Sequence, residues 1–159
     1  MNETATPPIV LWLSSRYESI ELAEALLDHV CKDRDLSGEA EHWVGMALRE
    51  ALANAIKHGN RQEPGKRVLV TLGCKEKTLE IEVGDEGAGF SPEEVADPLA
   101  AENQMKTSGR GIFYMRTFMD EVVFSRGEVG GTLLTLRKKL GTTSTTKGAE
   151  AHGQDRHNA

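Results

Sequence analysis

The sequence has few cysteines and no long hydrophobic run. Its two cysteines, Cys31 and Cys74, are far apart and form no CxxC pair, so neither a zinc site nor a disulfide framework is expected. No segment approaches the roughly 18 consecutive apolar residues of a membrane span, and residues 1–4 lack the basic and apolar regions of a secretion signal. We therefore expect a cytoplasmic protein with ordinary buried thiols.

Basic residues are also too few to indicate a polyanionic partner. The chain has 19 lysines and arginines against 25 aspartates and glutamates, which gives a formal charge of −6 and a pI near 5.4. Direct binding to nucleic acid or to an anionic membrane would call for a clustered basic face. That balance argues against either as the main partner, and the 159 residues suit one domain with a substantial core.

Hydrophobic periodicity predicts alternating strands and helices. Short apolar or alternating runs predict strands at 9–13, 68–74, 79–83, 122–124 and 132–136. Helical spacing predicts helices at 20–30, 37–59 and 112–119. The expected order is βααββαββ in one domain at 9–140, between a flexible segment at 1–8 and a disordered, apolar-poor tail at 141–159.

A carboxylate and an amide lie one turn apart in the second predicted helix. Glu50 and Asn54 flank its apolar stripe, so both can line a cavity beside the core. The Asn54 amide offers an oxygen ligand to Mg²⁺, and the Glu50 carboxylate can accept a proton from a nearby hydroxyl. A solvated surface pair is the alternative. His58 is left without a role, because a lone histidine at a helix end is typical of a cap or packing residue.

The phase of the strand at 79–83 provides a second signal. Asp85 continues the apolar face of that strand, where an unpaired carboxylate is costly to bury. A ligand removes the cost if it supplies a donor, such as the exocyclic amine of adenine. Gly87 and Gly89 would let the backbone approach that ligand. A type I turn capped by aspartate is the alternative for an isolated DxGxG motif.

Two further glycine-bearing segments follow. Residues 108–111 are expected to form a loop that runs into the third helix, where free backbone N–H groups and the helix dipole attract phosphate. Arg110 either adds a charge-assisted contact there or is simply solvated. Thr132, after two glycines, either ends a tight hairpin turn or contacts a nucleotide. Residues 84–111 are too long for a plain connection and form a candidate lid.

Taken in this order, the four motifs resemble the N, G1, G2 and G3 boxes of the GHKL ATPase superfamily, and most closely those of bacterial anti-sigma-factor serine/threonine kinases. The resemblance covers residues 9–138. It implies an α/β (α+β) two-layer sandwich of the histidine-kinase-like ATPase type, with a mixed, mainly antiparallel sheet covered on one face by helices. It also implies that ATP and Mg²⁺ bind under a mobile lid. Residues 102–107 lack the Thr-Thr-Lys sequence of some members, so a lid contact by Lys106 is not carried over.

The resemblance also implies roles for individual residues. Asn54 is the expected magnesium ligand, and Glu50 is the expected catalytic base that prepares the attacking hydroxyl. Asp85, helped by Thr132, is expected to read adenine. The other expected nucleotide-binding residues are the base-pocket glycines and the phosphate-binding segment: Gly87, Gly89, Gly109, Arg110 and Gly111.

The resemblance favours an ATP-dependent protein serine/threonine kinase that acts as an anti-sigma factor. Such a protein sequesters a sigma factor or similar regulator and phosphorylates a small antagonist protein, so regulation proceeds by partner switching. The alternative is a nucleotide-gated interaction module that binds ATP without transferring phosphate, although such a module would not need Glu50. A sensor histidine kinase is disfavoured because His29 lies inside the predicted domain, while a separate histidine-bearing chain and a homodimer both stay open.

Overall fold

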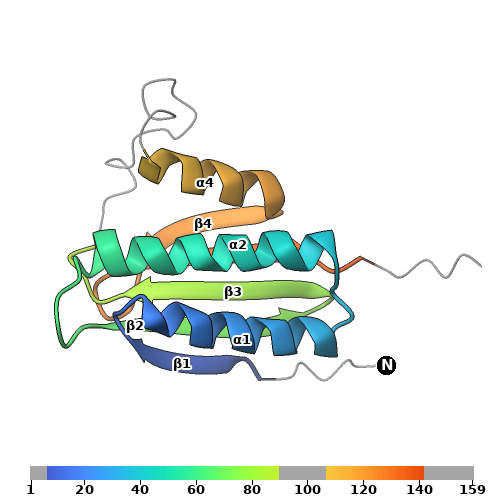
Figure 1. Ribbon diagram of the computed structural model, residues 1–159, viewed down its shortest axis with the longest axis horizontal. Helices are drawn as coiled ribbons and strands as arrows, with labels where there is room; N and C mark the ends of the chain where they lie inside the picture. Colours follow the sequence, from blue (N-terminus) through green and yellow to red (C-terminus); the bar gives the residue numbers. More distant parts are fainter. Residues whose placement is uncertain (1–6, 90–106, 142–159) are drawn as a thin grey trace, which may run out of the picture.

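The computed structural model describes residues 7–89 and 107–141, without the side chains of 107–109. The elements are β1 (Ile9–Ser14), α1 (Glu18–Asp33), α2 (Glu39–Asn54), the π-helical turn η1 (Ala55–Gly59), β2 (Arg67–Lys75), β3 (Thr78–Asp85), α4 (Thr107–Phe118), β4 (Glu121–Arg126) and β5 (Thr132–Lys139). Apart from η1, this is the predicted order (Figure 1). Most of the expected flexible start and tail, and the central part of the candidate lid with Lys106, lie outside the described residues.

The five strands form one sheet in the order β1-β2-β3-β5-β4. Every pairing among these strands is antiparallel, so the expected mainly antiparallel sheet is confirmed. The described strands contain no parallel pair, although a mixed sheet was expected to include one. Glu76 and Lys77 connect β2 to β3 with φ angles of 48° and 60°. Two successive positive φ values are typical of the tight hairpin turn that matches the strand twist.

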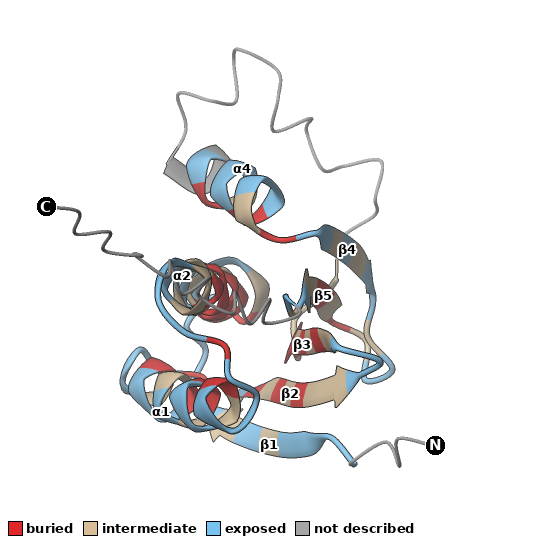
Figure 2. Cartoon of the chain, turned by 90° about the vertical axis from the view of Figure 1, so that its right-hand side faces the viewer, coloured by how far each residue is buried: buried red, intermediate tan, exposed pale blue. Residues whose placement is uncertain are grey.

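The helices cover one face of the sheet, with α2 between α1 and α4 (Figures 1 and 2). Alternate side chains of β2 and β3 point into this layer and are buried: Val68, Val70, Leu72, Leu79, Ile81 and Val83. The facing stripe of α2 consists of Val44, Ala47, Leu48, Ala51 and Leu52. Burial of each large apolar side chain contributes about 1.5–3 kcal/mol, so this interface holds the two-layer sandwich together.

All three predicted helices begin at residues other than those expected, and α1 begins two residues early, at Glu18. α4 begins at Thr107 rather than at Ile112, so the glycine-bearing segment at 108–111 lies in its first turns and not in a preceding loop. Glycine is a poor helix former, but the close packing of this segment against α2 outweighs that propensity. α2 begins after Gly38, whose φ is 67°, and Ser37 does not cap it.

The helices are amphipathic rather than apolar on all sides. α1, for example, buries Ile20, Ala23 and Leu27, while Leu22 is 62% exposed. Within residues 7–89 and 107–141, none of the helices combines the length and the hydropathy that crossing a bilayer would require.

Candidate functional site

A cavity of about 420 Å³ lies between the C-terminal end of α2, the start of α4 and the strands β3 and β5. This volume is within the range typical of small-ligand sites, about 300–1,000 Å³. Among the residues that line it are four of those predicted from the sequence: Asn54, Asp85, Gly89 and Thr132. Lining residues that sequence reasoning missed include Arg61, Ile112, Phe124 and Leu134. The cavity therefore has an apolar wall with a few polar groups at its edge.

Asp85 is the polar group at the end of β3, and it is only 5% exposed. The prediction that Asp85 lies on the buried face of this strand is confirmed. Its Oδ1 accepts hydrogen bonds from the N–H groups of Gly87 (2.9 Å) and Thr132 (3.2 Å). Thr132 thus contacts Asp85 through its backbone and not through its hydroxyl. Among the described residues no donor reaches Oδ2, so Asp85 offers one free acceptor at the cavity wall.

Three glycines from separate segments surround the Asp85 carboxylate. A Cβ at Gly59 would overlap Oδ2, one at Gly87 would overlap the Gly59 carbonyl, and one at Gly131 would overlap the Asp85 carbonyl. None of these glycines has a φ in the left-handed region, so what they supply is space. Gly89, in contrast, has a φ of 75° and permits the turn after β3. Gly59, Gly87 and Gly131 thus bring the backbone close around the Asp85 carboxylate, where no larger residue would fit.

Glu50 does not line the same cavity as Asn54. It lies against α4, where a Cβ at Gly111 would overlap its carboxylate, and it lines a separate cavity of about 50 Å³ between α2 and α4. Burial raises the pKa of the Glu50 carboxyl, and the positive charge of His58 partly offsets this rise. A carboxylate with a raised pKa is a better proton acceptor than an ordinary glutamate. The Glu50 carboxylate is therefore suited to act as a general base, although it faces α4 and not the large cavity.

The expected phosphate-binding residues lie in the first turns of α4. Arg110 is exposed and Gly111 is buried. The next residue, Ile112, lines the large cavity. The first four N–H groups of a helix lack intrahelical partners and carry the positive end of its dipole. In α4 these are the N–H groups of residues 107–110, so this helix start can attract an anion close to where Ile112 lines the cavity.

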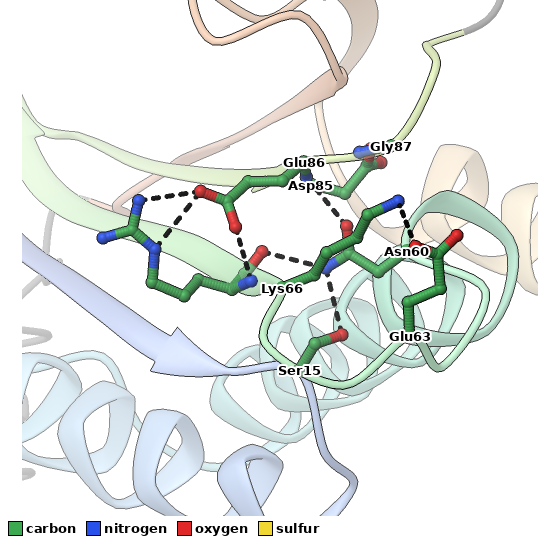
Figure 3. Close-up of polar contacts among 8 residues, drawn as sticks. Ser15, Asn60, Glu63, Lys66, Asp85, Glu86 and Gly87 are labelled. Carbon is green, nitrogen blue, oxygen red and sulfur yellow. Dashed lines mark hydrogen bonds and ion pairs between the residues drawn. The ribbon is translucent and has the colours of Figure 1, made fainter.

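Asn60 is a buried polar residue that the sequence did not single out. It is fully buried and connects the ends of β1, β2 and β3 through its side-chain amide (Figure 3). An asparagine directly after a helix-ending glycine is commonly part of a turn, so its identity alone gave no sign of burial.

Residues 13–138 match the family described as histidine kinase-like ATPase domain, and the chain belongs to this family. Within it, the chain is related to proteins named anti-sigma F factor. It is 36% identical over 96 residues to the anti-sigma F factor of Heyndrickxia coagulans. This match covers 58% of this chain and 65% of the relative, so the chain spans less than two thirds of that relative's length. It is 28% identical over 132 residues to that of Geobacillus thermodenitrificans, covering 82% of this chain and 90% of the relative. The resemblance to anti-sigma-factor proteins is confirmed.

Solved structures share the architecture of this chain. The crystal structure of the RsbU and RsbW domains of Rv1364c from Mycobacterium tuberculosis has a TM-score of 0.58 at 18% identity, covering 85% of this chain and 33% of that chain. The histidine kinase domain of the Erythrobacter litoralis EL346 blue-light activated histidine kinase has a TM-score of 0.50 at 17% identity, covering 78% and 60%. At such identities the likeness concerns the fold, and it confirms the histidine-kinase-like ATPase fold.

Proposed function

We propose that the large cavity binds ATP together with Mg²⁺ and that the protein is a serine/threonine kinase acting as an anti-sigma regulatory factor. The observation that carries this proposal is the Asp85 carboxylate. Two backbone N–H groups hold its Oδ1, while no donor within the described residues reaches its Oδ2. Asp85 lines the cavity, so its Oδ2 is an acceptor open to a ligand there, and the exocyclic amine of adenine supplies a matching donor.

The rest of the cavity suits a nucleotide. Gly59, Gly87 and Gly131 keep side chains away from Asp85, and the apolar lining residues can contact a flat base. Asn54, which lines the cavity, would hold Mg²⁺ through its amide oxygen. Within the described part of the chain no three His, Cys, Asp or Glu side chains are grouped as a metal site. Mg²⁺ commonly needs only one or two protein ligands, because substrate phosphates and waters complete its shell.

The chemistry proposed for Glu50 is general base catalysis. Its carboxylate would accept the proton of a serine or threonine hydroxyl as the hydroxyl oxygen bonds to the γ-phosphorus of ATP and the bond to the ADP oxygen breaks. The N–H groups at the start of α4 would orient the phosphates, and Mg²⁺, when bound, neutralises their charge. Phosphoryl transfer depends mostly on positioning and charge neutralisation, so one base and one metal are sufficient.

The proposed partners follow from the relatives, which are named anti-sigma F factors. The protein would sequester a sigma factor or similar regulator in the cytoplasm. Phosphorylation of a small antagonist protein on serine or threonine would prevent that antagonist from displacing the regulator. The phosphorylation state of the antagonist would thus decide which partner is bound.

One observation favours a second candidate, a nucleotide-gated interaction module that binds ATP without transferring phosphate. Glu50 packs against Gly111, in a cavity separate from the one that Asn54 lines. A protein that only binds ATP needs no accessible base, whereas a kinase requires this carboxylate to reach the incoming hydroxyl.

Transfer of labelled γ-phosphate in a lysate of the source cells separates the two candidates. The reaction is run with the wild-type protein, with Glu50→Ala, and with neither. We expect one small protein to be labelled only with the wild type. If no specific band forms although the wild type binds ATP, the kinase is excluded and the nucleotide-gated module replaces it.

A further inference from the structure

Asn60 joins three segments that are distant in sequence (Figure 3). Its Nδ2 donates to Ser15 Oγ after β1 (3.0 Å) and to the Arg67 carbonyl at the start of β2 (2.8 Å). Its Oδ1 accepts a hydrogen bond from the Glu86 N–H directly after β3 (2.8 Å). Both amide hydrogens and the amide oxygen are therefore used inside the protein, where water does not compete.

The backbone around Asn60 adopts an unusual course. Its N–H donates to the Ala55 carbonyl five residues back (2.7 Å), which closes the π turn of η1. Arg61 and Gln62 follow with φ angles of 52° and 56°, although neither is glycine. π turns and left-handed non-glycine residues are unfavourable by themselves and are frequent at functional sites. The surrounding contacts must hold this segment, and the Asn60 side chain makes three of them.

The contact with Glu86 links this network to the cavity. Glu86 follows Asp85 directly, so Asn60 fixes the peptide group that joins the two residues. The Glu86 side chain also forms an ion pair with Arg67 (2.7 Å), and its hydrogen bonds with Arg67 lower the pKa of the Glu86 carboxyl. The Arg67 side chain in that ion pair is 53% exposed, so the pair contributes little. The end of β3 is held by its pairing with β2, which extends to Val68 and Asp85, and the Asn60 bond adds a restraint on the Glu86 N–H directly beyond that pairing.

We propose that Asn60 is a positioning residue for nucleotide-base selection. By holding the Asp85–Glu86 peptide, it keeps the free Asp85 oxygen directed at the base, and it thereby sets the preference for adenine over guanine. This inference rests on the proposed ATP site. The competing view is that Asn60 only stabilises the fold, in which case its loss lowers stability but leaves base preference intact.

The test compares dissociation constants for ATP and GTP, both with Mg²⁺, and the melting temperature of each variant. Asn60→Ala removes all three hydrogen bonds, whereas Asn60→Asp retains an oxygen acceptor for the Glu86 N–H. Ser15→Ala is the matched control, because it removes an Asn60 partner on the side away from Asp85. We expect the ratio of the GTP to the ATP dissociation constant to fall about tenfold in Asn60→Ala, the size of one lost buried hydrogen bond.

Asn60→Asp should keep most of the base preference even though a buried charge lowers its melting temperature, and Ser15→Ala should keep all of it. The inference is overturned if Asn60→Ala melts earlier but retains the wild-type ratio, or if Asn60→Asp loses as much preference as Asn60→Ala. If Asn60→Ala does not fold, Asn60→Ser replaces it, since serine is polar but too short to reach Glu86. A wild-type protein that binds ATP no better than GTP contradicts the proposed adenine site itself, which distinguishes the two failures.

Discussion

The carboxylate of Glu50 lies against the backbone of Gly111 so closely that a single methyl group on Gly111 would overlap it. Gly111→Ala must therefore displace either the carboxylate or the start of α4. If Glu50 is the base, we expect this substitution to reduce phosphate transfer at least tenfold, about 1.4 kcal/mol in activation free energy. The initial rate of transfer of labelled phosphate to the antagonist measures the effect.

Gly45→Ala on α2 is the matched control for that variant. A Cβ at Gly45 meets no atom within 4 Å, so this substitution leaves the site unchanged. It should stabilise the protein by up to about 1 kcal/mol, because alanine favours a helix over glycine. Equal transfer rates in Gly111→Ala and Gly45→Ala would argue against a catalytic role for the Glu50–Gly111 contact.

Ionised Glu50 should destabilise the fold. Its raised pKa means that the folded state binds the proton more tightly than the unfolded state does, so stability is lost as the pH rises above the ordinary glutamate pKa of 4.5. Glu50→Gln should consequently have a higher melting temperature than the wild type at pH 7.5. The difference should shrink as the pH falls toward and below 4.5, because the wild-type carboxyl takes up a proton over that range. Calorimetry at both pH values measures it, and Glu128→Gln, at an exposed position, is the control.

His58, which lines the large cavity, should influence the pH dependence of transfer through its charge. Its positive charge lowers the Glu50 pKa, opposing the larger effect of burial. His58→Ala removes that charge, so the Glu50 pKa should rise further and the acid side of the rate–pH profile should move to higher pH. His29→Ala, which changes an exposed histidine on α1, is the control. Identical profiles for His58→Ala and the wild type would exclude this electrostatic contact.

The sequence predicted those features that depend on local periodicity. The alternation from Leu79 to Val83 fixed the face on which Asp85 lies, because a strand turns each successive side chain to the opposite side. The order of strands and helices followed from the same patterns.

Features that depend on contacts between distant segments could not be read in this way. The glycines at 109 and 111 indicated a loop, but packing of Gly111 against Glu50 includes them in α4. The sequence predicted Gly59 only as the end of a helix. The fold shows that a side chain at this position would overlap the Asp85 carboxylate. The buried position of Asn60 could not be predicted either, because its three hydrogen-bond partners are between 7 and 45 residues away along the chain.

Calorimetric titration of the wild type and of Asp85→Asn with ATP and Mg²⁺ tests the central claim most directly. The substitution has nearly the same size, but its amide oxygen would accept from the Gly87 and Thr132 N–H groups, which leaves an NH₂ donor where the amine of adenine needs an acceptor. Loss of a charged hydrogen bond costs about 1.5–3 kcal/mol, so we expect the affinity for ATP to fall about 10- to 100-fold in a protein that still folds. Exposed Asp33→Asn should bind as the wild type does. Unchanged ATP affinity in folded Asp85→Asn would contradict the assignment of this cavity as the adenine site.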